Sequence, residues 1–72
     1  MAPRQIPLTS ESEGLREWDI TTADGTYYIK DDMGDWTLYK LVGPCRTTDW
    51  EAIGAGIDID AFLKQHNLTL AE

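Results

Sequence analysis

Cysteine and histidine are nearly missing from this chain of 72 residues, which holds one of each, Cys45 and His66. One cysteine cannot form an internal disulfide, and the two residues together are too few for a zinc site of the finger type. A lone cysteine also suits a reducing compartment. We therefore predict a cytoplasmic protein that carries no metal and no cofactor.

Long apolar runs are missing as well. No stretch approaches the roughly eighteen consecutive apolar residues that a membrane-spanning helix needs. Residues 1–8 also lack the apolar centre of a signal peptide. The sequence therefore predicts a soluble protein that makes no contact with membranes.

Basic residues are few. Six Lys and Arg face thirteen Asp and Glu, which gives a formal net charge of −7. This charge repels nucleic-acid phosphates and anionic lipids, so we expect no direct nucleic-acid partner. Two interpretations of the acidity stay open. It serves solubility alone, or it binds a basic protein, such as one whose nucleic-acid groove it would block.

Two turn signals nine residues apart organise the middle of the chain. Asp24-Gly25 and Met33-Gly34 each suit the centre of a two-residue hairpin. They predict three strands over residues 15–22, 26–31 and 36–42. In this register Ile20 lies opposite Ile29 and Asp19 beside Lys30. The second hairpin sets Ile29 opposite Leu38 and Tyr28 beside Tyr39.

Side chains alternate between the two faces of a strand, so the register also sorts the residues by face. The first face carries large apolar residues that a C-terminal helix can cover. The opposite face carries two tyrosines and their neighbours. The first set is Trp18, Ile20, Tyr27, Ile29, Trp36 and Leu38, and the second is Thr21, Tyr28, Lys30, Tyr39 and Leu41.

Two helices are predicted after the sheet. Thr48 and Glu51 match a capping box that would open a helix of about one turn, with Trp50 and Ile53 turned inward. Residues 54–56, Gly-Ala-Gly, would end it.

The second helix is predicted to begin with Asp58 as its N-cap. Ile57 and Phe62 would then form a hydrophobic staple across its start. Asn67 is a suitable left-handed terminator. The apolar stripe of this helix is Ile59, Phe62 and Leu63, with His66 at its border, and Leu68 and Leu70 would cover the end of the core.

Residues 1–13 hold two prolines and a polar run, and we predict that they form a flexible N-terminal arm, with Ile6 or Leu8 packed on the domain. Residues 14–72 would form a single domain. The predicted fold class is α+β, a three-stranded antiparallel β-meander with one face covered by C-terminal helices.

No residue set matches a catalytic or metal signature. His66 has no identifiable carboxylate or nucleophile to work with. Cys45 precedes Arg46, whose charge would lower the thiol pKa, but an inert loop thiol explains it equally well. The aspartates at 31, 32 and 35 do not have EF-hand spacing. We therefore predict that the chain is not an enzyme.

The tyrosine face is the feature most suited to binding. Tyrosines offer rigid contact area and are enriched at protein interfaces. We predict a protein interface made of Tyr28, Tyr39, Leu41, Thr21 and Lys30. The alternative is a solvated face that the N-terminal arm partly covers.

The block from Trp18 to Ile29, WDITTADGTYYI, followed by GDWTLY over residues 34–39, resembles small open reading frames of actinobacterial phages and their hosts. The resemblance spans about two-thirds of the chain. It implies a short, non-enzymatic product that binds a host or virion protein, and it transfers no site residues.

Two functions follow from these observations. The first is a small acidic protein-binding module, a phage-encoded modulator or inhibitor of a host protein. A more specific version of this hypothesis is that the module inhibits by mimicry of DNA. The alternative is a structural homo-oligomer, such as a homodimer, whose subunits pair through the exposed sheet face.

Overall fold

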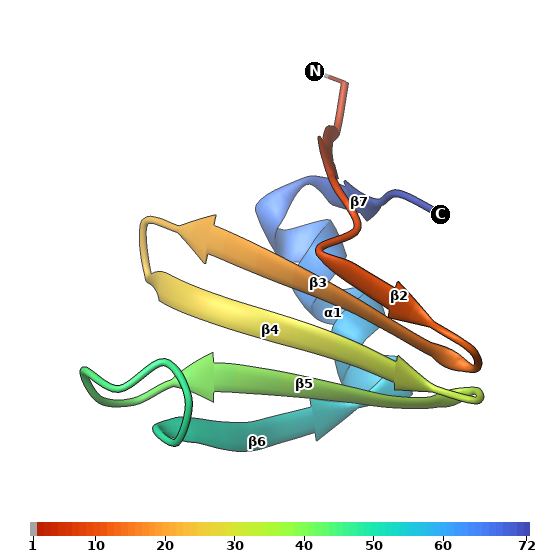
Figure 1. Cartoon of the computed structure of the whole chain (residues 1–72). Coiled ribbons are helices and arrows are strands. Elements are labelled where there is room, and N and C mark those ends of the chain that lie inside the picture. Colours follow the sequence, from red (N-terminus) through yellow and green to blue (C-terminus); the bar gives the residue numbers. More distant parts are fainter. Residues whose placement is uncertain (1) are drawn as a thin grey trace.

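The computed structural model describes residues 2–72, and Met1 lies outside that range. Its elements form one five-stranded sheet, one two-stranded sheet and one helix (Figure 1). In chain order they are β1 (Arg4–Ile6), β2 (Ser10–Ser12), β3 (Leu15–Thr22), β4 (Gly25–Asp32), β5 (Asp35–Leu41), β6 (Trp50–Ala55), α1 (Gly56–His66) and β7 (Leu68–Leu70).

The main sheet is antiparallel, and its strands lie in the order β2-β3-β4-β5-β6. Helix α1 lies across one face of it, which we call the inner face (Figure 1). We call the other face the outer face. The predicted α+β class is confirmed. The predicted size is wrong, because over residues 2–72 β2 and β6 extend the three-stranded meander on both sides and one helix replaces the expected two.

The second hairpin has the predicted register. Tyr28 pairs with Tyr39 and Ile29 pairs with Leu38. Met33 and Gly34 at its centre have φ angles of 52° and 90°. Positive φ at both central residues defines the tight turn whose twist matches that of the two strands.

The first hairpin differs from the prediction by two residues. Ile20 pairs with Tyr27 rather than Ile29, because the turn is centred one residue earlier and Thr22 pairs with Gly25. The Thr22 hydroxyl accepts the Asp24 N–H at 3.1 Å and donates to the Gly25 carbonyl at 3.2 Å. This side chain closes the turn. A shift of two residues leaves every side chain on its predicted face.

The inner face and the helix enclose the core. Trp18, Ile20, Ile29 and Leu38 are each at most 3% exposed, and they pack against Ile59, Phe62 and Leu68. The predicted inner-face set is thus confirmed, with Trp36 packed at its margin.

The N-terminal segment belongs to the fold, so the prediction of a separate flexible arm is wrong. Residues 4–6 form β1, which runs parallel to β7, and residues 10–12 form β2 at the edge of the main sheet. Ile6 is 4% exposed within the core, and Leu8 packs against it, as the sequence suggested for these two residues. The pairing of β1 with β7 holds the N-terminal segment against the domain.

The short helix predicted after Thr48 is wrong, since residues 50–55 form strand β6. Pairing with β5 satisfies those backbone groups of the segment that face the sheet, whereas a single helical turn would leave its end groups without intrahelical partners. The Asp49 carboxylate accepts the Cys45 N–H at 2.9 Å and holds the preceding turn. At the other end, a Cβ on Gly54 would lie 2.5 Å from the Asp58 side chain, so only glycine fits where β6 enters α1.

Helix α1 begins at Gly56, two residues before the predicted N-cap. Asp58 lies in its first turn, and its carboxylate accepts the Ala55 N–H at 2.9 Å. Ile57 is 82% exposed, so the predicted staple with Phe62 does not form. Asn67 ends the helix with φ 54°, as predicted. No helix among residues 2–72 combines the length and apolarity needed to span a bilayer.

Candidate functional site

Three aromatic side chains lie together on the outer face, one from each of three neighbouring strands. Tyr28 on β4 has its ring centre 5.5 Å from that of Tyr39 on β5, at 68° between the ring planes. It lies at the same distance from Trp50 on β6, at 75°. Both are edge-to-face contacts, the arrangement that aromatic pairs prefer. We call these three residues the aromatic cluster.

The aromatic cluster borders a shallow depression of about 150 Å³, whose fourth wall is Lys30. The Lys30 Nζ atom lies 5.9 Å from the centre of the Tyr39 ring, within the range of a cation–π contact. The Trp50 indole N–H donates to the Arg46 carbonyl at 2.6 Å. That hydrogen bond fixes the indole, so the depression is a preformed surface.

Three of the five predicted interface residues line this depression, namely Tyr28, Tyr39 and Lys30. Leu41 is the ladder partner of Trp50 and lies beside the cluster. Thr21 is exposed on β3, outside the lining residues.

Trp50 is the residue that sequence reasoning missed, because the capping-box pattern placed it in a helix. Apolar and charged side chains alternate at Trp50, Glu51 and Ala52, and this alternation is typical of a strand. In the ladder with β5, this alternation puts Trp50 and Ala52 on the outer face.

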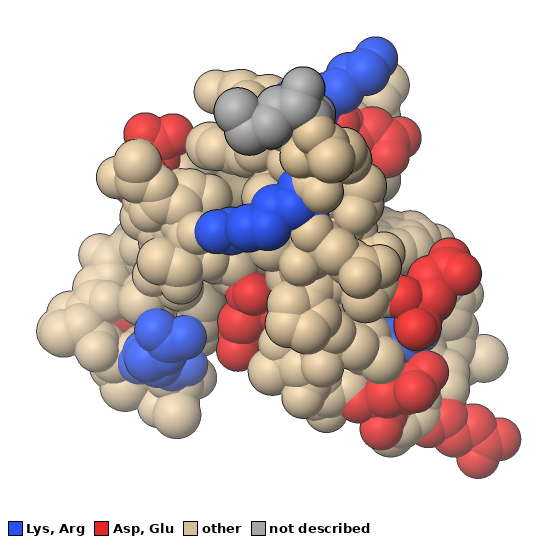
Figure 2. Space-filling model, turned by 90° about the horizontal axis from the view of Figure 1, so that it is seen from above, with Lys and Arg blue, Asp and Glu red and all other residues tan. Residues whose placement is uncertain are grey.

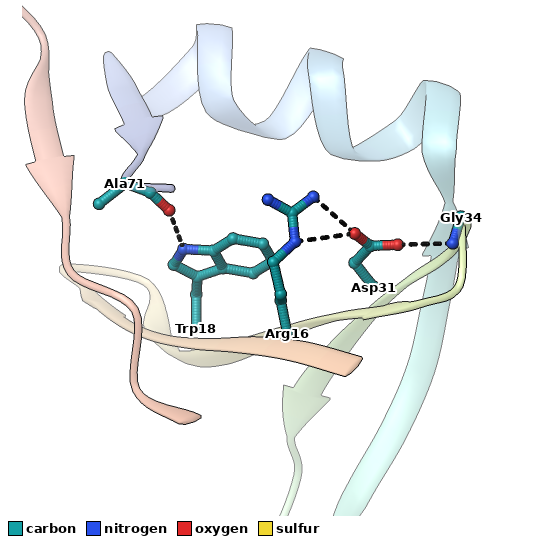
Figure 3. A network of polar contacts seen from close by, with 5 residues as sticks. All are labelled: Arg16, Trp18, Asp31, Gly34 and Ala71. Atoms are coloured by element: carbon teal, nitrogen blue, oxygen red, sulfur yellow. Dashed lines mark hydrogen bonds and ion pairs between the residues drawn. The ribbon is translucent and has the colours of Figure 1, made fainter. Parts of the chain in front are cut away.

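A polar network occupies the inner face near the β4–β5 turn (Figure 3). The Arg16 Nη2 atom lies 2.7 Å from the Asp31 Oδ2 atom, and Nε donates to the same oxygen at 3.1 Å. The other oxygen of Asp31 accepts the Gly34 N–H at 2.9 Å. Hydrogen bonding by Arg16, helped by Gly34 and opposed by desolvation, holds the pKa of Asp31 below its usual value.

Arg16 also lies over two tryptophans. Trp18 and Trp36 stack with ring centres 5.5 Å apart, and the guanidinium lies 5.4 Å and 5.7 Å from them. The Trp18 indole N–H donates to the Ala71 carbonyl at 2.8 Å (Figure 3). This network joins β3, β4 and the C-terminal residues, and none of its buried side-chain polar atoms lacks a hydrogen-bond partner, so we assign it a structural role.

The remaining candidates lie apart from the aromatic cluster. His66 packs against Phe62 with ring centres 4.6 Å apart, at the border of the core as predicted. Cys45 is exposed in the loop before β6. Hydrogen bonding by Thr47, and then by Thr48, lowers the pKa of the Cys45 thiol to about 6. The cause is these two threonines rather than the Arg46 charge considered from the sequence.

On the side seen in Figure 2, acidic side chains gather toward one end of the sheet. Most of those visible from above lie toward the β2–β3 and β4–β5 turns (Figure 2). Glu13, Asp32 and Asp35 are exposed there. Over residues 2–72, no group of three His, Cys, Asp or Glu side chains is placed to hold a metal ion.

Comparison of this chain with protein-family models, with curated proteins and with solved structures returns no match. The outer face is where the geometry departs most from what folding alone requires, because three large aromatic rings lie on the side that α1 leaves uncovered.

Proposed function

We propose that this chain is a small, acidic, non-enzymatic protein-binding module and that the aromatic cluster is its binding surface. The observation that carries the proposal is the preformed group of Tyr28, Tyr39 and Trp50 on the uncovered face of the sheet. Rigid aromatic side chains give large contact area at a small loss of side-chain entropy, which is why they dominate binding hot spots.

The charge distribution favours apolar contact at this surface. Residues 36–57 contain Lys40 and Arg46 as well as Asp49 and Glu51, and they carry no net charge. Glu17 and Asp19 on β3 lie on the same face, as ladder partners of Lys30 and Tyr28. A module that mimicked DNA would need carboxylates, rather than aromatic rings, at the centre of its binding face. We therefore propose that aromatic contact provides the affinity and that the acidic end excludes acidic partners or steers basic ones.

Following the resemblance to phage and host reading frames, the partner we propose is a host or virion protein that this module modulates. Affinity purification from an actinobacterial lysate, followed by quantitative mass spectrometry, tests the proposal. The bait is the wild-type chain, and the variant is Tyr39→Ala. The matched control is Thr37→Ala, which alters the same face of the same strand two residues away.

We expect a protein that wild type and Thr37→Ala enrich and that Tyr39→Ala loses, while the far-UV circular dichroism of all three chains is the same. Enrichment should persist in 1 M salt, where the screening length falls to about 3 Å. Equal capture by all three chains, or capture that salt abolishes, would refute the aromatic surface. A wild-type dimer that Tyr39→Ala dissociates, with no second protein captured, would favour the structural homo-oligomer.

A further inference from the structure

Strand β6 is an open edge of the main sheet. Figure 1 shows β6 as the last strand on one side, and within residues 2–72 the strand paired with it is β5. Ala52 and Ala55 are exposed, and the side chain of Ile53 is at the surface with 47% exposure. Edge strands that carry neither proline nor lysine present unpaired N–H and C=O groups to any strand that approaches.

The free backbone groups of β6 can be assigned. The Val42 N–H donates to the Asp49 carbonyl at 2.8 Å, so Asp49 faces β5. In an antiparallel ladder, alternate residues direct both backbone groups toward the same neighbour. Glu51 therefore also faces β5, while Trp50 and Ala52 direct their N–H and C=O groups out of the sheet.

The net charge of the chain limits which partners can bind to this edge. The whole chain carries −7, so two copies repel over most of their surface. The exception is the segment 36–57, in which two basic residues balance two acidic ones. It contains all of β6 and every residue of β5 except Asp35, and Glu51 on β6 is the ladder partner of Lys40 on β5. The open edge thus carries little net charge, and a second copy approaches it with reduced repulsion.

We propose that two copies of this chain pair antiparallel through β6, with Ala52 of each copy at the two-fold axis, to form one continuous ten-stranded sheet. This register uses the outward N–H and C=O groups of Ala52 in reciprocal hydrogen bonds. Glu51 then lies opposite Ile53 of the second copy, so the two carboxylates do not face each other. Trp50 lies opposite Gly54, where no side chain crowds the indole.

The pairing extends the proposed function without depending on it. Each aromatic cluster ends at Trp50, on the strand nearest the two-fold axis. The two outer faces would therefore meet in a single aromatic surface that presents two equivalent binding sites. The register of β5 and β6 shifts where Ile53 is left without a partner on β5, and this irregularity limits the regular part of the new ladder to a few residues. Interfaces of this size are weak, so we expect dimerisation in the micromolar range or above.

Analytical ultracentrifugation of the full chain, from micromolar to millimolar concentration, tests the pairing. The variant is Ala52→Pro, which removes one outward N–H and leaves the β5–β6 hydrogen bonds in place. The matched control is Ala52→Val, which keeps the N–H. We expect wild type and Ala52→Val to form dimers. The dimer dissociation constant of Ala52→Pro should be higher by roughly tenfold or more.

A wild-type chain that stays monomeric at every concentration would overturn the proposal. So would an Ala52→Pro chain that folds and dimerises like wild type, which would assign self-association to another surface. If Ala52→Pro does not fold, disulfide trapping decides the question. The Cα atoms of a hydrogen-bonded pair lie about 5.5 Å apart, within disulfide reach.

For the trapping experiment, Ala52→Cys is placed in a Cys45→Ser background and oxidised gently. Its control is Ser12→Cys in the same background, on β2 at the opposite edge of the sheet. We expect covalent dimers from the first chain and not from the second. Equal cross-linking of both chains would refute pairing through β6.

Discussion

Replacing a buried isoleucine on the inner face should cost far more stability than replacing an exposed one. Ile29 lies at the centre of the sheet, between Trp18 on β3 and Leu38 on β5, and is 0% exposed. Ile57 at the start of α1 is 82% exposed. Truncation of each to alanine removes the same atoms, so the difference reports burial together with the smaller effect of helix and strand propensity.

The size of the effect follows from burial and chain length. Ile29→Ala should lower the free energy of unfolding by about 3 kcal/mol, since a fully enclosed site relaxes little around the lost atoms. A chain of 72 residues is expected to have roughly 4–11 kcal/mol in total. The melting temperature should fall by roughly 12–24 °C. Ile57→Ala should change stability by less than about 0.5 kcal/mol.

Thermal melts and urea titrations followed by far-UV circular dichroism measure both variants against wild type. An unchanged dependence on urea concentration would show that the same surface is exposed on unfolding. If the two variants lost similar stability, or if Ile29→Ala lost less than about 1 kcal/mol, the assignment of the inner face would be wrong.

Three further predictions concern the ion pair, the cysteine and the glycines. The pKa of Asp31 is depressed in the folded chain, so its ionised carboxylate adds to the free energy of unfolding above the unfolded pKa near 3.9, and this stabilisation is lost as the pH falls through the folded pKa. Asp31→Asn should therefore reduce the fall in stability at acid pH that urea titrations measure in wild type. An equal fall in both chains would contradict this. The rate of Cys45 alkylation should rise with pH, with a midpoint near pH 6. Thr47→Val should move that midpoint to higher pH. A wild-type midpoint near 8.5 would exclude the hydrogen bond between Thr47 and the Cys45 thiol. Gly34 has φ 90° with open space around it, so Gly34→Ala should destabilise the fold by about 1 kcal/mol. Gly56 is helical and has nothing near an added Cβ, so Gly56→Ala should stabilise the fold by up to roughly 1 kcal/mol. Melting temperatures that shift in the same direction for both variants would be inconsistent with these backbone conformations.

Local turn chemistry explains what could be predicted of the sheet. Gly34 adopts positive φ without a side-chain penalty at the centre of the second hairpin, so the register of β4 and β5 was predictable. The first turn was not, because the Thr22 hydroxyl competes with the Asp24-Gly25 signal and moves the centre by one residue. Face assignment is preserved under such a shift, and the core was therefore still identified correctly.

The strands at the margins depend on contacts that sequence does not show. Strand β2 is short, polar and exposed, without apolar alternation to reveal it. Strand β1 exists through its pairing with β7, more than sixty positions away in the chain. Residues 50–55 are too few for their pattern to separate helix from strand, and pairing with β5 decides the outcome.

The candidate site was therefore predictable in part. Tyr28 and Tyr39 were identified because their face follows from the second hairpin alone. Trp50 was not, because its position depends on a strand formed by long-range pairing. The aromatic cluster is complete only when β6 is included, so the proposed binding surface and the proposed self-pairing edge both depend on the same strand.

The most direct test of this account is a nuclear Overhauser measurement on the isolated chain in solution. We predict contacts between the ring protons of Tyr28 and Trp50, and a close Hα–Hα contact between Tyr39 and Ala52, which are ladder partners in β5 and β6. Contacts of helical spacing across residues 49–54, with the Trp50 indole against the core, would contradict the account.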